Sequence, residues 1–182
     1  MLTPEWITTE RLTLRLPSPA DVDPLSGLYD DPVALAHAGT TAVWGKEQTR
    51  DRLEQWNAAY QQHGHTIYTV VLQESGTIVG LCGLAPIPGG PPDLACMLAR
   101  PFWRHGYARE ASRAILSLAQ ASPQPQSLTI HMEPDHPSLS AMERTIFFPH
   151  GFTYEGQRLY PRSSKVMRFY RWSPSGPQAV ST

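Results

Sequence analysis

The sequence is poor in charged residues and contains no long apolar run. Of its 182 residues only 17% are Asp, Glu, Lys or Arg, and fifteen basic against sixteen acidic residues give a formal net charge of −1. Such a balance provides no overall basic field to hold a polyphosphate backbone, so we expect no nucleic-acid partner. Because there is no run of about 18 apolar residues and no basic leader before an apolar stretch, we also expect no membrane association.

Cysteine is scarce as well. Cys82 and Cys96 are too few for a disulfide framework, and neither belongs to a CxxC or Cys/His pattern. No two histidines have the i, i+4 spacing of a helical metal site. We therefore expect a cytoplasmic protein with reduced thiols and no bound metal. The simplest interpretation of the cysteines is two small buried residues, although the hairpin expected around them could bring them close together.

Proline and glycine, by contrast, are abundant, with eighteen and thirteen residues. They predict short elements joined by firm turns. A chain of this length with 41% hydrophobic residues can bury one core, so we expect one domain over residues 1–173. The tail at 174–182 is expected to be disordered, because Val180 is its only aliphatic residue beyond alanine.

The apolar periodicity predicts about seven strands and several helices. The expected strands cover residues 11–16, 66–73, 77–85, 94–99, 127–132, 153–160 and 165–172. The expected helices run from Pro19 to near Gly27, over residues 46–62 and 107–120, and from about Ser138 to Ile146. This order implies an α+β domain with a mixed sheet rather than a uniformly alternating parallel one.

The segment at 93–120 is the most informative, because a strand turns through Gly106 directly into a helix. Such a turn aims several unpaired backbone N–H groups and the positive end of a helix dipole at one point, which suits a pyrophosphate. Arg104, His105 and Arg109 could add side-chain donors. A single glycine before a helix is also common without any ligand, and no Rossmann or Walker pattern is present.

Four segments occur together in a specific order. They are residues 9–15 (TERLTLR), 78–83 (IVGLCG), 103–111 (WRHGYAREA) and 151–156 (GFTYEG). In this order the sequence resembles the GNAT superfamily of N-acetyltransferases, and within it the branch of ribosomal-protein N-terminal acetyltransferases related to RimJ and RimL. The resemblance covers roughly residues 7–172 and implies a GNAT fold, with helices flanking a mixed sheet whose two central parallel strands splay apart.

The resemblance also implies a binding site for acetyl-CoA as cosubstrate. The backbone from Arg104 to Ala108 would cradle the pyrophosphate, and the pantetheine arm would lie along the strand at Cys96–Ala99. A backbone N–H near Met97 would face the thioester oxygen and stabilise the negative charge that develops there. The implied contact residues are Met97, Leu98, Ala99, Trp103, Arg104, His105, Gly106, Tyr107, Ala108, Arg109 and Asp135, the last standing where the family commonly has Asn.

Acetyl transfer to an amine also requires a base and a proton donor to the leaving thiolate. Asp93 stands where this branch often has an acid that accepts the proton of the amine, although it could simply begin a surface strand. Glu133 could act as base or amine anchor, or as a solvated strand end. Ser138 matches a serine that some relatives are thought to use as the proton donor. His131 could point toward the cofactor or into the core.

These observations predict an N-acetyltransferase of the GNAT type that transfers acetyl from acetyl-CoA to a primary amine by direct attack in a ternary complex. The acceptor is expected to be a protein N-terminal residue or a small amine, and the protein a monomer or a homodimer. The alternative is a non-catalytic acyl-CoA-binding module that has kept the phosphate loop. An acid at Asp93 and a hydroxyl at Ser138 favour the enzyme.

Overall fold

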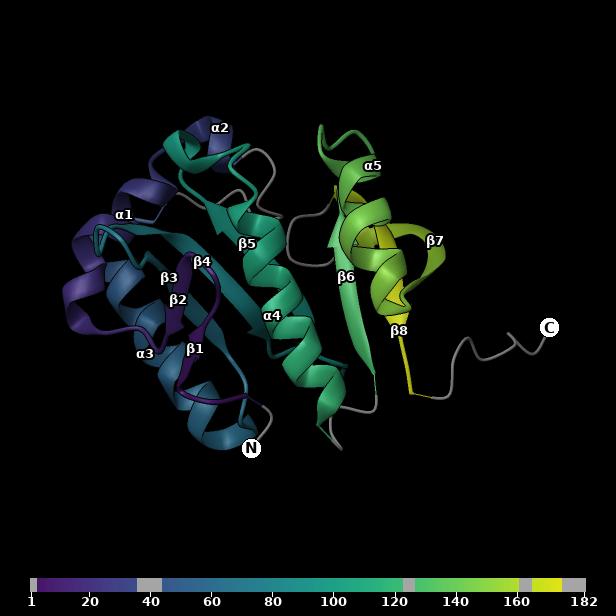
Figure 1. Ribbon diagram of the computed structural model, residues 1–182, viewed down its shortest axis with the longest axis horizontal. Helices are drawn as coiled ribbons and strands as arrows, with labels where there is room; N and C mark the ends of the chain where they lie inside the picture. Colours follow the sequence, from purple (N-terminus) through teal and green to yellow (C-terminus); the bar gives the residue numbers. More distant parts are fainter. Residues whose placement is uncertain (1–2, 36–43, 123–126, 161–164, 175–182) are drawn as a thin grey trace.

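The computed structural model describes residues 3–35, 44–122, 127–160 and 165–174. Their strands form one mixed sheet in the order β1-β2-β3-β4-β5-β6-β8-β7 (Figure 1). The strands are β1 (Trp6–Thr8), β2 (Leu12–Arg15), β3 (Ile67–Leu72), β4 (Ile78–Ala85), β5 (Asp93–Leu98), β6 (Leu128–Met132), β7 (Thr153–Tyr160) and β8 (Lys165–Trp172). The α-helices are α1 (Val22–Tyr29), α2 (Pro32–Leu35), α3 (Lys46–His63), α4 (Tyr107–Ala121) and α5 (Leu139–Met142).

Helices cover the two faces of the sheet with separate apolar clusters. On one face α4 packs through Ala111 and Ile115 against alternate residues of the strands, including Leu94 and Leu98 of β5. On the other face α1 and α3 pack against a second cluster, which Ala95 and Met97 of β5 adjoin. Figure 1 shows α4 lying along the centre of the sheet, with α5 on the β6 and β8 side. The side chains of β5 therefore alternate between the two layers.

The centre of the sheet contains its one parallel pair among the described strands, β5 and β6. Their register has only two steps, Asp93 opposite Thr129 and Leu94 opposite Ile130. Beyond Leu94 the two strands separate, whereas β5 stays paired with β4 as far as Leu98. The expected α+β fold with splayed central strands is thus confirmed.

The structure differs from the expected element list in a few places. The sheet has eight strands instead of about seven, because β1 is only three residues long and too short to show an alternating pattern. The first long helix continues past Gly27 to Tyr29, and the short helix α2 follows it. The helix expected from Ser138 to Ile146 is α5 followed by a π-helical stretch, Glu143–Phe147.

Two features are absent from the described residues. Among them no helix is both long and apolar enough to cross a lipid bilayer. In the same part of the chain, no group of three or more His, Cys, Asp or Glu side chains could hold a metal ion. The predicted disordered tail falls at 174–182, and all but Pro174 of it lies outside the described residues.

Candidate functional site

The turn between β5 and α4 has an unusual backbone. Arg104 has a φ of 65° and is the only residue other than glycine with a positive φ in the described part of the chain. Gly106 follows with a φ of 83° and caps the amino end of α4. A left-handed conformation is unfavourable for arginine, and such strain is concentrated at ligand sites. The alternation of left-handed residues in one turn makes a concave nest of N–H groups.

The donors of this nest are unused. The backbone N–H groups of residues 104–108 donate to no other residue that the structure describes. Two of them belong to the first turn of α4, a 15-residue helix, whose dipole adds partial positive charge at the same point. Unpaired N–H groups at the start of a helix form a binding site for an anion such as a phosphate.

Side chains on either side hold the turn in place. The Trp103 indole Nε1 donates to the carbonyl oxygen of Leu98 at 2.6 Å, which ties the turn to the end of β5. His105 Nδ1 lies 2.8 Å from the carbonyl oxygen of Trp103, and its ring stacks on Tyr107 with a centroid distance of 5.5 Å. The loop is thus organised by its own residues, and the nest is preformed.

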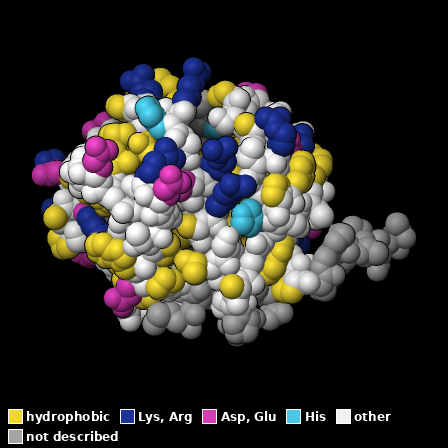
Figure 2. Space-filling model, in the orientation of Figure 1, with side chains coloured by type: hydrophobic (Ala, Val, Ile, Leu, Met, Phe, Trp, Pro, Cys, Tyr) yellow, Lys and Arg dark blue, Asp and Glu magenta, His cyan; other side chains and the backbone are white. Residues whose placement is uncertain are grey.

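The basic residues near the turn are not equivalent. Arg100 is paired with Asp31, so its charge is already balanced. Arg104 and Arg109 form no ion pair with the described residues, and both are exposed. Figure 2 shows Lys and Arg side chains gathered over the amino-terminal half of α4. Positive charge therefore remains available for an anionic ligand beside the nest.

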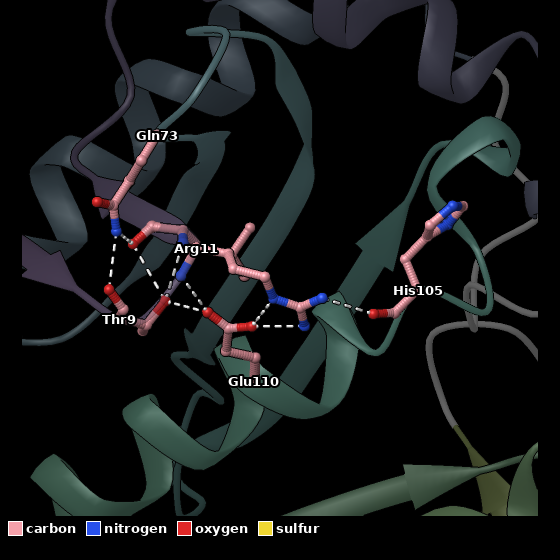
Figure 3. Close-up of polar contacts among 6 residues, drawn as sticks. Thr9, Arg11, Gln73, His105 and Glu110 are labelled. Carbon is pink, nitrogen blue, oxygen red and sulfur yellow. Dashed lines mark hydrogen bonds and ion pairs between the residues drawn. The ribbon is translucent and has the colours of Figure 1, made fainter.

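A polar clamp joins the nest to the amino-terminal part of the chain (Figure 3). The Glu110 carboxylate, one turn into α4, accepts hydrogen bonds from the Thr9 hydroxyl at 2.6 Å and from the Arg11 backbone N–H at 2.8 Å. The Arg11 guanidinium binds the same carboxylate through Nε at 2.8 Å and Nη2 at 2.7 Å. Through Nη1 it also donates to the carbonyl oxygen of His105 at 3.0 Å. Arg11 therefore links β2 to the nest.

The clamp keeps Glu110 ionised. Partial burial alone would raise the pKa of this carboxyl, but the hydrogen bonds from Thr9 and Arg11 outweigh that effect, so its pKa lies below the usual value. The same contacts raise the pKa of the Arg11 guanidinium, chiefly through its hydrogen bond with Glu110. Both partners stay charged at neutral pH, and the position of the His105 carbonyl is fixed.

One edge of β5 is open next to the nest. Ala99 N–H donates to Val79 of β4, and successive backbone groups of a strand point to opposite edges. The N–H groups of Met97 and Ala99 therefore face β4, whereas those of Cys96 and Leu98 face the side from which β6 has diverged. The expected N–H donor near Met97 is consequently that of Cys96 or Leu98.

Two of the candidate catalytic residues, Asp93 and Glu133, lie on the sheet face opposite α4. Asp93 Oδ1 is 2.5 Å from His131 Nδ1, and both side chains are buried. Glu133 Oε1 is 2.5 Å from Lys165 Nζ, so this carboxylate is part of an ion pair. The structure thus brings together Asp93 and His131, which the sequence had placed in separate segments.

The other two candidates are at the surface. Ser138 is exposed at the amino end of α5, and its backbone N–H donates to His136 Nδ1 at 3.1 Å. Asp135 is exposed in the turn that follows β6. Neither side chain has a hydrogen bond or ion pair with the described residues that would assign it a role. Their proposed roles remain predictions.

Two contacts between distant residues were not predicted from the sequence. The Arg11–Glu110 clamp joins residues 99 positions apart, and the Asp93–His131 pair joins residues 38 apart. Arg11 and Glu110 each stand in one of the four motifs, whereas Asp93 and His131 stand in none of them. Their pairing depends on the sheet order, which a single sequence does not display.

Comparison with known proteins agrees with this arrangement. The acetyltransferase (GNAT) domain family matches residues 11–145, which span β2 to the π-helical stretch. The uncharacterized N-acetyltransferase p20 of Bacillus licheniformis is 24% identical over 168 residues, covering 91% of this chain and 94% of p20.

Solved structures share the fold. A putative GNAT-family acetyltransferase from Bordetella pertussis superposes with a TM-score of 0.75 at 19% identity, covering 93% of this chain and all of the other. RimL, a ribosomal alpha-N-protein acetyltransferase in complex with coenzyme A, superposes with a TM-score of 0.74 at 18% identity, covering 93% and 98%. With the family match over residues 11–145, these findings show that the chain belongs to the GNAT acetyltransferase family.

Proposed function

We propose that the protein transfers an acetyl group from acetyl-CoA to a primary amine by direct attack in a ternary complex. The observation that carries the proposal is the adjacency of two unused sets of backbone donors. The N–H groups of residues 104–108 suit a pyrophosphate, and the open edge of β5 suits the amide-containing pantetheine arm. Acetyl-CoA contains both groups in one molecule. The RimL match supports the proposal, because that protein was solved with coenzyme A.

The contacts of acetyl-CoA can be assigned along the turn and the strand. Residues Arg104 to Ala108 would donate backbone N–H groups to the pyrophosphate, and the side chains of Arg104, His105 and Arg109 would add charge-assisted hydrogen bonds. The Trp103 indole already donates a hydrogen bond to the Leu98 carbonyl oxygen. The Leu98 N–H, on the same open edge of β5, is the neighbouring donor. Cys96 N–H lies closest to the last paired step of β5 and β6, and we assign it to the thioester oxygen.

A covalent acetyl intermediate on Cys82 has no support. Cys82 and Cys96 stand directly opposite each other on β4 and β5. The contact with the Cys96 thiol and complete burial raise the pKa of the Cys82 thiol well above its usual value. The nucleophile in thiol chemistry is the thiolate, so Cys82 is inert. Direct attack by the amine needs neither thiol.

The acceptor is proposed to be a protein N-terminal residue, with a small amine as the second choice. The structural match to RimL, named as an alpha-N-protein acetyltransferase, favours the first. Glu133 is proposed as an anchor for the amine rather than as the base, because its carboxylate already forms an ion pair with Lys165. Ser138 is proposed to return a proton to the coenzyme thiolate.

Release of the free thiol from acetyl-CoA tests this function. The protein would be incubated with acetyl-CoA and a panel of amines and peptides with free N-termini, and the thiol would be measured with a colorimetric reagent. We expect release that depends on both the protein and at least one amine. Tight coenzyme A binding with background release for every acceptor would instead identify a non-catalytic acyl-CoA-binding module.

The clamp between Arg11 and Glu110 is expected to affect the affinity for acetyl-CoA. In Glu110→Gln the charge-assisted bonds to Arg11 are lost, so Arg11 no longer holds the His105 carbonyl firmly. We expect the Kd for acetyl-CoA, measured by titration calorimetry, to rise about tenfold, since hydrogen bonds to charged groups are worth about 1.5–3 kcal/mol.

The matched control for the clamp is Glu74→Gln, an exposed glutamate in the turn between β3 and β4. It removes the same charge away from the nest and should leave the Kd unchanged. If Glu110→Gln binds acetyl-CoA as tightly as the wild type, the clamp does not organise the nest.

A further inference from the structure

The most specific feature outside the coenzyme contacts is a buried imidazole–carboxylate pair. His131 Nδ1 is 2.5 Å from Asp93 Oδ1, and the two side chains are 9% and 8% exposed. Asp93 opens β5 and is paired with Thr129, and Leu94 is paired with Ile130. His131 is the next residue of β6. The pair therefore sits at the step where the two central strands begin to separate.

The contacts of the ring fix its orientation. Phe169 of β8 meets the imidazole edge-on, with ring centroids 3.9 Å apart, and the Tyr160 ring of β7 lies 4.7 Å away. A carboxylate only accepts hydrogen bonds, so a neutral His131 donates through Nδ1–H and carries its lone pair on Nε2. Within the described residues His131 has no hydrogen bond other than the one to Asp93.

The position of the pair matches that of the proposed thioester donor. If the ladder of β5 and β6 continued, His131 would stand opposite Ala95, the residue before Cys96. The Cys96 N–H points into the gap between the strands, and the Asp93–His131 pair lies on the face opposite α4. Acyl transfer requires a base and an oxyanion donor at one reacting centre, and both candidates lie where β5 and β6 begin to separate.

From this geometry, and resting on the proposed acetyl transfer, we infer that His131 Nε2 is the general base and that Asp93 is its positioning residue. His131 Nε2 takes one proton from the acceptor ammonium and passes it to solvent. The neutral amine then attacks the thioester carbon, so that a C–N bond forms and the C–S bond breaks. The second proton of the attacking nitrogen reaches the coenzyme thiolate through the Ser138 hydroxyl, and the coenzyme leaves as the thiol.

Other charged groups share this face of the sheet and set the local field. On β6 and β8, Glu133 is paired with Lys165. On β7, the Arg158 guanidinium lies 4.0 Å from the Phe169 ring centroid. On β8, Arg171 binds Glu155. These charges are mutually paired or stacked on an aromatic ring, and Asp93 is the carboxylate that contacts the imidazole directly.

The test compares His131→Asn with Asp93→Asn at saturating acetyl-CoA, with an acceptor found active for the wild type. For His131→Asn we expect kcat to fall about 10²–10⁴-fold, the usual contribution of a general base. The Kd for acetyl-CoA should stay unchanged, the acid limb of the pH–rate profile should vanish, and added imidazole should restore part of the rate. His63→Asn, which alters an exposed histidine, should behave as the wild type.

For Asp93→Asn we expect a smaller fall in kcat with the acid limb of the pH–rate profile still present, because the imidazole remains but loses the carboxylate that orients it. A merely structural role of His131 would leave the acid limb in place in His131→Asn. Thermal unfolding and circular dichroism would check the fold of each variant. If His131→Asn does not fold, His131→Gln takes its place in the kinetic assays.

The assignment is overturned if His131 variants keep the wild-type rate while Asp93→Asn is inactive, since Asp93 would then be the base itself. It is also overturned if the folded His131 variants retain the acid limb. A wild-type protein that acetylates no amine would contradict the proposed function instead, so the two failures are distinguishable.

Discussion

Replacing Gly106 with tryptophan is expected to abolish acetyl-CoA binding, with a loss of more than about 100-fold in affinity, or about 2.8 kcal/mol. Gly106 stands at the centre of the nest, with a φ of 83°. A side chain there would project beside the N–H groups of residues 104–108 and exclude the pyrophosphate. Exclusion of the pyrophosphate removes the contacts that are proposed to hold the most strongly charged part of the ligand.

The folded state should tolerate this substitution. A Cβ at Gly106 would meet its nearest atoms, Nη2 of Arg11 and of Arg109, at 3.5 Å and 3.7 Å, which are ordinary contacts. The remaining cost is the left-handed backbone, about 1–2 kcal/mol. The free energy of unfolding from denaturant titration should therefore fall by that amount, while calorimetry with acetyl-CoA gives no measurable heat of binding.

Gly76→Trp is the matched control for strain and bulk. Gly76 has a φ of 68° in the turn between β3 and β4, and a Cβ there has nothing within 4 Å. The variant should lose similar stability yet bind acetyl-CoA as the wild type does. Equal affinities for Gly106→Trp and the wild type would refute the nest as the coenzyme site.

The buried carboxylate of Asp21 is expected to contribute strongly to the stability of the fold. The Asp21 carboxylate is 1% exposed and accepts hydrogen bonds from both terminal nitrogens of Arg15 at 2.7 Å. It also accepts from the Ser18 backbone N–H at 2.9 Å and the Thr69 hydroxyl at 2.8 Å. One side chain thus fastens the start of α1 to β2 and β3.

Asp21→Asn should lower the free energy of unfolding by about 3 kcal/mol, because it leaves a half-buried guanidinium without its partner. For a domain of this size the Tm would fall by roughly 6–12 °C. Asp23→Asn removes an exposed carboxylate paired with Lys46 and should change stability by less than about 1 kcal/mol. Similar losses for the two variants would contradict the assigned role of Asp21.

The same carboxylate gives stability a pH dependence. Burial alone would raise the pKa of Asp21, but the bonds from Arg15, Ser18 and Thr69 outweigh it and hold that pKa below its usual value. Its contribution is therefore present above about pH 4 and is lost as the pH falls through the lowered pKa of the folded state. The stability difference between wild type and Asp21→Asn should narrow in acid.

The sequence predicted those parts of the fold whose signals are local. The helix that begins at Tyr107 could be placed because a glycine precedes an apolar stripe that includes Ala111 and Ile115. The strand β2 could be placed from alternation, and β3 and β4 from runs of β-branched and apolar residues. The anion site could be suggested from Gly106, but the left-handed Arg104 could not, since arginine carries no preference for that conformation.

The contacts that couple distant segments were not predictable. His131 could be assigned to a strand but not to Asp93, because their contact exists only where the parallel pairing of β5 and β6 sets them side by side. Likewise, which backbone donors of β5 are unused follows from its register with β4. The strand β1 was not predicted, because three residues are too few to show an alternation of polar and apolar side chains.

A crystal structure of the protein with coenzyme A would show whether the turn at residues 104–108 and the open edge of β5 bind this ligand. We predict pyrophosphate oxygens within hydrogen-bond distance of the backbone N–H groups of residues 104–108. The pantetheine arm should follow the open edge of β5 past Leu98 and Cys96, with its sulfur toward the step where β5 and β6 diverge. Coenzyme A bound elsewhere, or at the loop with its pantetheine directed away from β5, would rule out this coenzyme site.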